Sequence, residues 1–239
     1  MKQASKIIAG NWKMNKTREQ AHDFFKALGE KHLRDNHRVI ICPPFTAIAI
    51  AREYADNMGF TVGAQDFYMP VKNGAMTGEI STEMLMEIGV KTVLVGHSER
   101  RAHSNETDQL ISQKVKHAIE VGLMPILCIG ETLEEREGGK MKQVLRDQLV
   151  SALHYPHDKF IIAYEPVWAI GTGKTADAKT IDEAHKFIKS VIGEDVAVLY
   201  GGSVNEKNAQ EILGIKSVDG VLVGGASLDA DKFSAIINA

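Results

Sequence analysis

The chain has 239 residues, of which 44% are hydrophobic and 25% are charged, a composition typical of globular proteins. With 28 lysines and arginines against 31 acidic residues, its net charge of −3 argues against nucleic acid or an anionic membrane as the main partner. The apolar core of the N-terminal segment is too short for a signal peptide, and no apolar run approaches the length of a membrane span.

Eight short apolar runs, rich in valine and isoleucine, follow one another along the chain. They lack the alternation of polar and apolar residues that marks a half-exposed strand, so we expect parallel strands buried on both faces. The runs are KIIAG from Lys6, RVIICP from Arg38, FTVGAQ from Phe60, KTVLVGH from Lys91, MPILCIG from Met124, KFIIAYEP from Lys159, VAVLYGG from Val196 and VDGVLVGG from Val218.

Segments with helical periodicity lie between these runs, and Asn105 with Asp108 is expected to cap one of them in the manner of a weak capping box. Repeated strand–helix units without a break in composition predict a single (β/α)8 barrel domain over residues 1–239, with eight parallel strands surrounded by helices. A doubly wound open sheet is the main alternative, but the eight units and the lack of G-x-G-x-x-G after the first run count against it. The apolar helical faces are Ala21, Phe24, Phe25 and Leu28; Ile111, Val115, Ala118 and Ile119; Leu145, Leu149 and Leu153; and Ile181, Ala184, Ile188 and Val191.

Polar or glycine-rich sequence follows most of the runs. All strands of a barrel run the same way, so these residues converge on the C-terminal rim, where barrel active sites lie. Each residue also has a purely structural interpretation, such as a surface lysine, a core histidine, a helix cap or a plain turn. For the Arg100-Arg101 pair, structural salt bridges are the favoured interpretation. The segments are Gly10-Asn11-Trp12-Lys13, Gln65-Asp66, His97-Ser98-Glu99-Arg100-Arg101, Gly130-Glu131, Glu165, Gly201-Gly202-Ser203 and Gly224-Gly225.

The segment YEPVWAIGTGKT at 164–175 supports two interpretations. Its end looks like the GKT of a nucleotide-binding P-loop, G-x-x-x-x-G-K-[ST]. The first glycine of that motif falls at Trp168, which cannot supply the positive φ and the close backbone approach that glycine allows. The segment also lies late in the chain, whereas P-loops follow the first strand of their fold. A P-loop nucleotide-binding protein is therefore a disfavoured alternative.

A small phosphorylated molecule fits the rim better. The glycine-bearing loops at 171–173, 201–203 and 224–225 can present backbone N–H groups to an anion, and Lys13 adds a positive charge. Glu165 and His97 suit proton abstraction next to a carbonyl, in which the carboxylate takes the proton while the imidazole polarises the oxygen. No Cys/His cluster has metal-ligand spacing, and no metal or cofactor is expected. A barrel that binds a sugar phosphate without catalysis remains as an alternative, although binding needs no base aimed at carbon.

Several motifs together resemble the triosephosphate isomerases, and the resemblance runs from Lys6 to the C-terminus. It implies a TIM barrel that interconverts dihydroxyacetone phosphate and D-glyceraldehyde 3-phosphate through an enediolate, as an isomerase of glycolysis and gluconeogenesis, usually a homodimer. The combination of A-Y-E-P-V-W-A-I-G-T-G-K with G-H-S-E-R-R is highly specific. The motifs are N-W-K-M-N at 11–15, G-H-S-E-R-R at 96–101, C-I-G-E at 128–131, A-Y-E-P-V-W-A-I-G-T-G-K at 163–174, Y-G-G-S-V at 200–204 and V-G-G-A-S at 223–227.

The resemblance also implies a role for each matching residue. Glu165 would be the base that shuttles the substrate proton, and neutral His97 would act on the enediolate oxygens. Lys13 would stabilise negative charge, and Asn11 would hold a substrate oxygen. Residues 166–174 would close as a lid that excludes water. The implied phosphate-binding residues are Gly171, Ser203, Gly224 and Gly225, and the supporting residues are Glu99, Glu131 and Trp168.

Three positions near the implied dimer contact depart from the family pattern. Met76, which with Thr77 belongs to the loop that docks into a partner subunit, stands where the family usually has phenylalanine. Asp66 replaces a usual asparagine, and 102–105 lacks a common aromatic residue. We expect a homodimer, because methionine packs adaptably, although lost aromatic anchors weaken association.

The two cysteines, Cys42 and Cys128, both lie inside apolar runs. Cysteines in such runs are expected to be buried and reduced, and reduced thiols are typical of the cytoplasm. The sequence thus favours a cytoplasmic protein whose partners are a small phosphorylated substrate and a second copy of itself, without nucleic acid or membrane.

Overall fold

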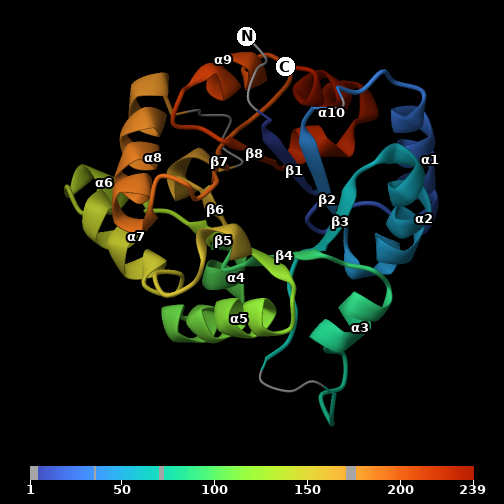
Figure 1. Ribbon diagram of the computed structural model, residues 1–239, viewed down its shortest axis with the longest axis horizontal. Coiled ribbons are helices and arrows are strands. Elements are labelled where there is room, and N and C mark those ends of the chain that lie inside the picture. The colour runs from blue at the N-terminus through green and yellow to red at the C-terminus, as the bar shows by residue number, and fades with distance from the viewer. Residues whose placement is uncertain (1–4, 35, 70–72, 171–175) are drawn as a thin grey trace.

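Eight parallel strands close into a barrel surrounded by helices in the computed structural model, which describes residues 5–34, 36–69, 73–170 and 176–239 (Figure 1). Each strand pairs with the next along the chain, and the last pairs with the first. The predicted (β/α)8 barrel is therefore confirmed, and each predicted run coincides with one strand to within a few residues. The strands are β1 (Ile7–Asn11), β2 (Arg38–Cys42), β3 (Thr61–Ala64), β4 (Thr92–Val95), β5 (Met124–Ile129), β6 (Ile161–Tyr164), β7 (Val198–Tyr200) and β8 (Gly220–Val223).

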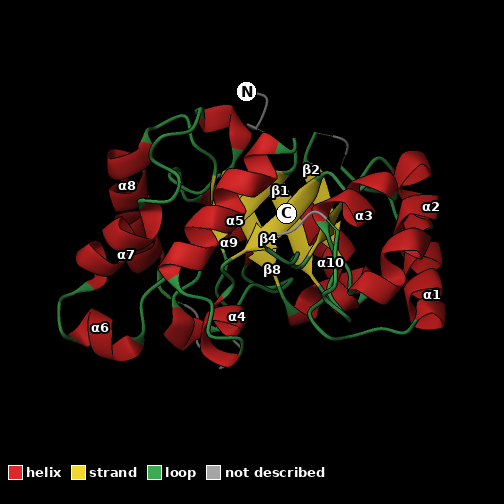
Figure 2. Ribbon diagram, turned by 90° about the horizontal axis from the view of Figure 1, so that it is seen from below, coloured by secondary structure: helices red, strands yellow, loops and turns green. Residues whose placement is uncertain are grey.

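The helices form the outer layer, with the strands at the centre (Figure 2). Short 3-10 helices lie mainly in the loops, and two of them follow β6 and β8 directly. The α-helices are α1 (Arg18–Gly29), α2 (Ile48–Met58), α3 (Thr82–Glu87), α4 (Ser98–His103), α5 (Asp108–Glu120), α6 (Leu133–Glu137), α7 (Met141–Leu149), α8 (Ala178–Ile192), α9 (Ala209–Gly214) and α10 (Ala230–Ile237). The 3-10 helices are η1 (Phe45–Ala47), η2 (His157–Lys159), η3 (Val167–Ala169) and η4 (Gly225–Leu228).

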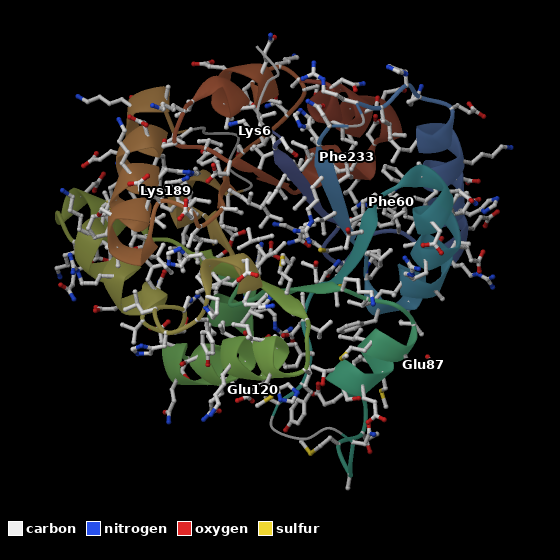
Figure 3. All side chains as sticks on the ribbon, viewed as in Figure 1. Lys6, Phe60, Glu87, Glu120, Lys189 and Phe233 are labelled. Atoms are coloured by element: carbon white, nitrogen blue, oxygen red, sulfur yellow. The ribbon has the colours of Figure 1, made fainter. Side chains whose placement is uncertain are left out.

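Apolar side chains fill two regions, one inside the barrel and one between the strands and the helices. Successive residues of a strand point to opposite faces, so Ala9 belongs to the interior cluster while Ile8 packs under the helices. Both faces of the strands are thus buried, which explains why their sequences do not alternate. Figure 3 shows Glu87 and Glu120 at the periphery, whereas Phe233 of α10 lies near the barrel. A Cβ on Gly10 of β1 would lie 3.2 Å from the ring of Phe233, so glycine permits this close contact.

Two details of the helix prediction were wrong. Thr107, rather than Asn105 with Asp108, caps α5, because its hydroxyl accepts a hydrogen bond from the N–H of Leu110. Asn105 instead adopts a left-handed φ of 52° in the turn before the helix. The helical face predicted from Leu145, Leu149 and Leu153 is shorter than expected. Helix α7 stops at Leu149, and Leu153 lies beyond it, 41% exposed. There the Ser151 hydroxyl donates to the Gln148 carbonyl, a local bond of the kind that competes with the helical ladder.

Both cysteines are free and buried, as predicted. Burial raises the pKa of Cys42 to about 12, so this thiol stays protonated and unreactive. No helix within the described part of the chain is long and apolar enough to cross a membrane.

His185 of α8 is fully buried against the aromatic residues that end β6 and β7. Its ring lies 5.9 Å from that of Tyr164 and 6.5 Å from that of Tyr200, between centroids. Its Nδ1 lies 3.2 Å from the carbonyl oxygen of Ser217. Burial lowers the pKa of His185 to about 4, because a charged imidazole is poorly solvated there.

We expect this buried histidine to make the protein less stable in acid. As the pH falls below about 6.5, the unfolded chain protonates His185 before the folded chain does, so the free energy of unfolding decreases toward about pH 4. The pKa difference corresponds to about 3 kcal/mol. Urea titrations at several pH values measure this dependence. In His185→Phe the free energy of unfolding should fall less steeply between about pH 6.5 and pH 4, whereas His154→Gln, at an exposed position, should behave like the wild type. An unchanged slope in His185→Phe would contradict the expectation.

Candidate active site

The polar residues that follow the strands meet around a cavity of about 160 Å³ at the C-terminal end of the barrel. The structure therefore brings together the predicted catalytic residues Asn11, Lys13, His97 and Glu165. Gly171 lies outside the described residues, as does the rest of the GTGKT sequence. Within the described ranges, no group of three or more His, Cys, Asp or Glu side chains could hold a metal ion. The cavity is lined by Asn11, Lys13, His97, Glu165, Ile170, Gly201, Gly202, Ser203, Val204, Asn205, Leu222, Gly224 and Gly225.

Glu165 follows β6 and is held in a narrow slot between the ends of β5 and β7. Its backbone N–H donates to the carbonyl of Ile129 at 2.7 Å, and its side chain is only 3% exposed. A Cβ on Gly130 would lie 1.8 Å from the carbonyl oxygen of Glu165, and one on Gly201 would lie 2.8 Å from its Cγ. Glycine is therefore required on both sides. The Oε2 atom accepts a hydrogen bond from the N–H of Ser98 at 3.3 Å.

His97 ends the loop after β4 and forms the N-cap of α4. Its Nε2 atom lies 3.1 Å from Oε1 of Glu165, and its Nδ1 accepts a hydrogen bond from the N–H of Glu99 at 3.2 Å. Burial disfavours the imidazolium, but the carboxylates of Glu165 and Glu99 outweigh burial and raise the pKa of His97. The hydrogen bond from the N–H of Glu99 favours the neutral imidazole instead, because Nδ1 can accept this bond only when it carries no proton. We assign the neutral ring on this geometry, with its proton on Nε2 toward Glu165.

Lys13 extends its ammonium into the site from a strained backbone. Its φ of 53° lies in the left-handed region, which costs a residue other than glycine about 1–3 kcal/mol. Two side chains hold this conformation: Oδ1 of Asn11 accepts from the N–H of Lys13 at 3.0 Å, and Nε2 of Gln65 donates to its carbonyl at 2.8 Å. Gln65 also donates to the carbonyl of Cys42 at 3.0 Å, which ties this turn to the end of β2.

Glu99 lies behind Lys13, as the motif implied. Its Oε1 atom is 2.6 Å from Nζ of Lys13. Burial would raise the pKa of Glu99, but the hydrogen bond and the charge of Lys13 outweigh it and lower that pKa. The ion pair therefore keeps the ammonium group fixed at the edge of the cavity.

Trp168, in η3, is anchored to a fully buried carboxylate. Its Nε1 donates to Oε1 of Glu131 at 3.3 Å, and the same oxygen accepts from the Tyr164 hydroxyl at 3.0 Å. Arg136 completes the cluster: its Nη1 lies 2.9 Å from Oε1 of Glu131, and its guanidinium lies 5.7 Å from the centre of the Trp168 ring. The described start of the predicted lid is thus fastened to the ends of β5 and β6.

Ser203 and the glycine pair after β8 also line the cavity. Oγ of Ser203 donates to the carbonyl of Ala169 at 2.6 Å, which joins this wall to the lid flank. Gly225 begins η4, and the Ser227 hydroxyl donates to the carbonyl of Gly224 at 2.7 Å. A helix that begins at the cavity offers backbone N–H groups to an anion.

The structural salt bridges predicted for Arg100 and Arg101 are confirmed. Arg100 pairs with Asp66 at 2.8 Å and with Glu106 at 2.7 Å, and Lys114 lies 2.6 Å from both carboxylates. Asp66, one of the departures from the family pattern, is therefore one of two anions in a ring of four alternating charges. Arg101 pairs with Asp108 at 2.6 Å.

Sequence reasoning assigned no role to Gln65 or Arg136. Gln65 was noted only as a polar residue after a strand, and its bond to Lys13 spans 52 residues. Arg136 lies in α6, five residues beyond Glu131, where nothing in the local pattern distinguishes it from a surface arginine.

A parallel barrel that presents a buried carboxylate, an imidazole and a lysine at the C-terminal ends of its strands defines the class of barrel enzymes that carry out proton transfer. The family model described as "Triosephosphate isomerase" matches residues 6–239. The chain therefore belongs to the triosephosphate isomerase family.

Relatives with the same printed name match nearly the whole chain. Triosephosphate isomerase from Alkaliphilus metalliredigens is 45% identical over 244 residues, covering 97% of this chain and 98% of the relative. The protein of that name from Lawsonia intracellularis is 46% identical over 246 residues, with coverages of 98% and 97%. The one from Fusobacterium nucleatum is 46% identical over 247 residues, with 98% of each chain covered.

Proposed function

We propose that this chain interconverts D-glyceraldehyde 3-phosphate and dihydroxyacetone phosphate. The observation that carries the proposal is the buried pair of Glu165 and His97, whose facing atoms are 3.1 Å apart at the wall of the cavity. A carboxylate and a neutral imidazole at this spacing can act on adjacent atoms of one small substrate. Family membership supplies the identity of the triose phosphates.

The reaction is a proton transfer between neighbouring carbons. Glu165 removes a proton from the carbon next to the carbonyl. The electron pair of the broken C–H bond forms a carbon–carbon double bond, and the π pair of the carbonyl moves onto its oxygen to give an enediolate. The Nε2–H of His97 donates to that oxygen, and Lys13 offsets the negative charge. His97 gives its Nε2 proton to that oxygen and takes the proton of the neighbouring hydroxyl, so the negative charge moves to the second oxygen. Glu165 then returns its proton to the other carbon, and the second oxygen becomes the new carbonyl. Asn11, which already orients the backbone of Lys13, holds a substrate oxygen.

The substrate phosphate is held where Ser203 and the glycine pair after β8 line the cavity. Its ligands are the backbone N–H groups of Ser203, Gly224 and Gly225, together with Gly171, which lies outside the described residues. The Ser203 hydroxyl is engaged with Ala169, so its backbone is the group that meets the anion. These N–H groups attract the phosphate without carrying formal charge.

Three further residues support the site without touching the reacting atoms. Glu99 fixes Lys13 at 2.6 Å, and Glu131 anchors Trp168 at 3.3 Å. The lid over residues 166–174, of which 171–174 lie outside the described residues, excludes water from the enediolate and so suppresses side reactions such as loss of phosphate.

A coupled assay tests the proposed activity directly. Glyceraldehyde 3-phosphate is supplied to the purified protein without added metal or nucleotide, and the formation of dihydroxyacetone phosphate is followed. We expect turnover under these conditions, together with no release of phosphate from ATP in a parallel reaction. A folded protein without isomerase turnover would overturn the proposal.

We further propose that the chain forms one domain over residues 1–239, acts in the cytoplasm and assembles as a homodimer. The free, buried cysteines support a reducing compartment.

Support for the dimer comes from apolar side chains exposed on one side of the barrel, where the segment before α3, with Met76 and Thr77, projects from the body of the molecule (Figure 1). Glu83 and Met84 line a groove of about 550 Å³ there. The exposed apolar residues here are Phe45, which lines the same groove as Met84, together with Met76 in the segment before α3 and Met86 in α3.

We expect Thr77→Arg to weaken the dimer, because it places a bulky charge on the segment that would enter the partner. Sedimentation velocity across a dilution series should show a dimer for the wild type and a shift toward monomer for this variant. Val150→Arg serves as the control, since Val150 is an exposed apolar residue at the end of α7, and α7 and α3 lie on different sides of the barrel (Figure 1). A wild-type monomer at every concentration would contradict the dimer.

A further inference from the structure

Helix α4 presents His97 and Glu99 to the site, yet none of its own residues is buried. A helix normally keeps its place by packing an apolar stripe against the core. Because α4 lacks such a stripe, polar contacts must hold it, and its two arginines, Arg100 and Arg101, make them.

The guanidinium of Arg101 donates to two backbone carbonyls as well as to Asp108. Its Nε lies 2.8 Å from the oxygen of Gly96, and its Nη2 lies 3.3 Å from the oxygen of Cys128. Its Nη1 pairs with Oδ1 of Asp108 at 2.6 Å. One planar group therefore fastens the end of β4, the start of α5 and β5 to one another.

Each of these two carbonyls belongs to a backbone segment that holds one of the two reacting residues. Gly96 immediately precedes His97, and its left-handed φ of 72° brings the turn close to Arg101. A Cβ on Gly96 would lie 3.2 Å from Nη2 of Arg101. Cys128 precedes Ile129, whose carbonyl accepts the backbone N–H of Glu165 at 2.7 Å. Arg101 is thus the link between the turn that orients His97 and the strand to which Glu165 is bonded.

We propose that Arg101 is a positioning residue that sets the 3.1 Å separation between Nε2 of His97 and Oε1 of Glu165. The proposal rests on the roles proposed above for those two residues. The planar fork of arginine can meet carbonyls in different directions at fixed spacing, which the single ammonium of lysine cannot do. Arg100 differs, because its contacts are with Asp66 and Glu106 rather than with either carbonyl.

The decisive variant is Arg101→Lys, which keeps the positive charge but not the fork. We expect kcat to fall by about 10-fold to 100-fold, the scale of a small misplacement of reacting groups. KM should change by less than about 3-fold, because the phosphate loops are untouched. The matched control is Asp108→Asn, which weakens the exposed ion pair but leaves both carbonyl bonds, so its kcat should stay within about 2-fold of the wild type.

Inhibitor binding distinguishes a displacement of His97 and Glu165 from a general destabilisation of the fold. Inorganic phosphate probes the phosphate loops, and a phosphorylated glycolic hydroxamate, planar like the enediolate, also probes His97 and Glu165. In Arg101→Lys, affinity for the hydroxamate should fall by about 10-fold or more while affinity for phosphate stays unchanged. Equal losses for both ligands, a wild-type kcat, or failure of Arg101→Lys to fold would each overturn the proposal. An inactive wild type, or an active Glu165→Gln, would instead contradict the proposed site roles.

Discussion

Replacing Glu165 with glutamine is expected to lower kcat by about 10²-fold to 10⁴-fold or more, the scale of lost general-base catalysis. Glutamine has the same shape and can still accept the hydrogen bond from the N–H of Ser98. It cannot take a proton from carbon, so the chemical step loses its base while substrate binding is preserved. Steady-state kinetics in the coupled assay should therefore show a large fall in kcat with little change in KM.

The control for this variant is Glu206→Gln, the same change at an exposed position in the loop after Ser203. It should leave both kinetic parameters near their wild-type values. If Glu165→Gln kept its kcat and only raised KM, the role proposed for Glu165 as the base would be wrong.

Replacing Lys13 with methionine is expected to lower kcat/KM by about 10²-fold to 10³-fold, the scale of losing one preorganised group that stabilises developing charge. The ammonium of Lys13 is fixed by Glu99 at 2.6 Å, so it meets the enediolate without reorganising. Methionine has nearly the same length but no charge. It also leaves the carboxylate of Glu99, behind residue 13, without its cation, which adds repulsion toward an anionic substrate.

Lys16→Met is the matched control, because Lys16 is in the same loop and also has a positive φ, here 72°. Its ammonium lies over the rings of Trp12 and Phe24 rather than in the cavity. We expect this variant to retain nearly all activity. If the two lysine variants were equally impaired, the loss would reflect the loop backbone and not the charge at the site.

The strands and the rim could be predicted because both depend on local sequence. A strand buried on both faces must be apolar throughout, as RVIIC of β2 is, and such runs are easily recognised. Once all strands run parallel, each residue after a strand falls on the same rim. Glu165, His97 and Lys13 could therefore be placed together before any distance was known.

The contacts that hold these residues could not be predicted in the same way. Gln65 reaches the carbonyl of Lys13 across 52 residues, and Arg101 reaches that of Cys128 across 27. Such bonds depend on the direction of individual side chains, which hydrophobic periodicity does not determine. The N-cap of α5 could not be predicted either, although it is a local feature. Thr107 lies between Asn105 and Asp108, and all three are residue types that can cap a helix.

The measurement that tests the central claim most directly is isomerisation of dihydroxyacetone phosphate in D2O, with the product analysed by proton NMR. If Glu165 carries the proton as a carboxylic acid, that proton exchanges with solvent before it returns to carbon. The account predicts deuterium on carbon 2 of the glyceraldehyde 3-phosphate, and far slower product formation with Glu165→Gln. A product formed at the wild-type rate with no solvent deuterium would contradict the predicted exchange and with it the account.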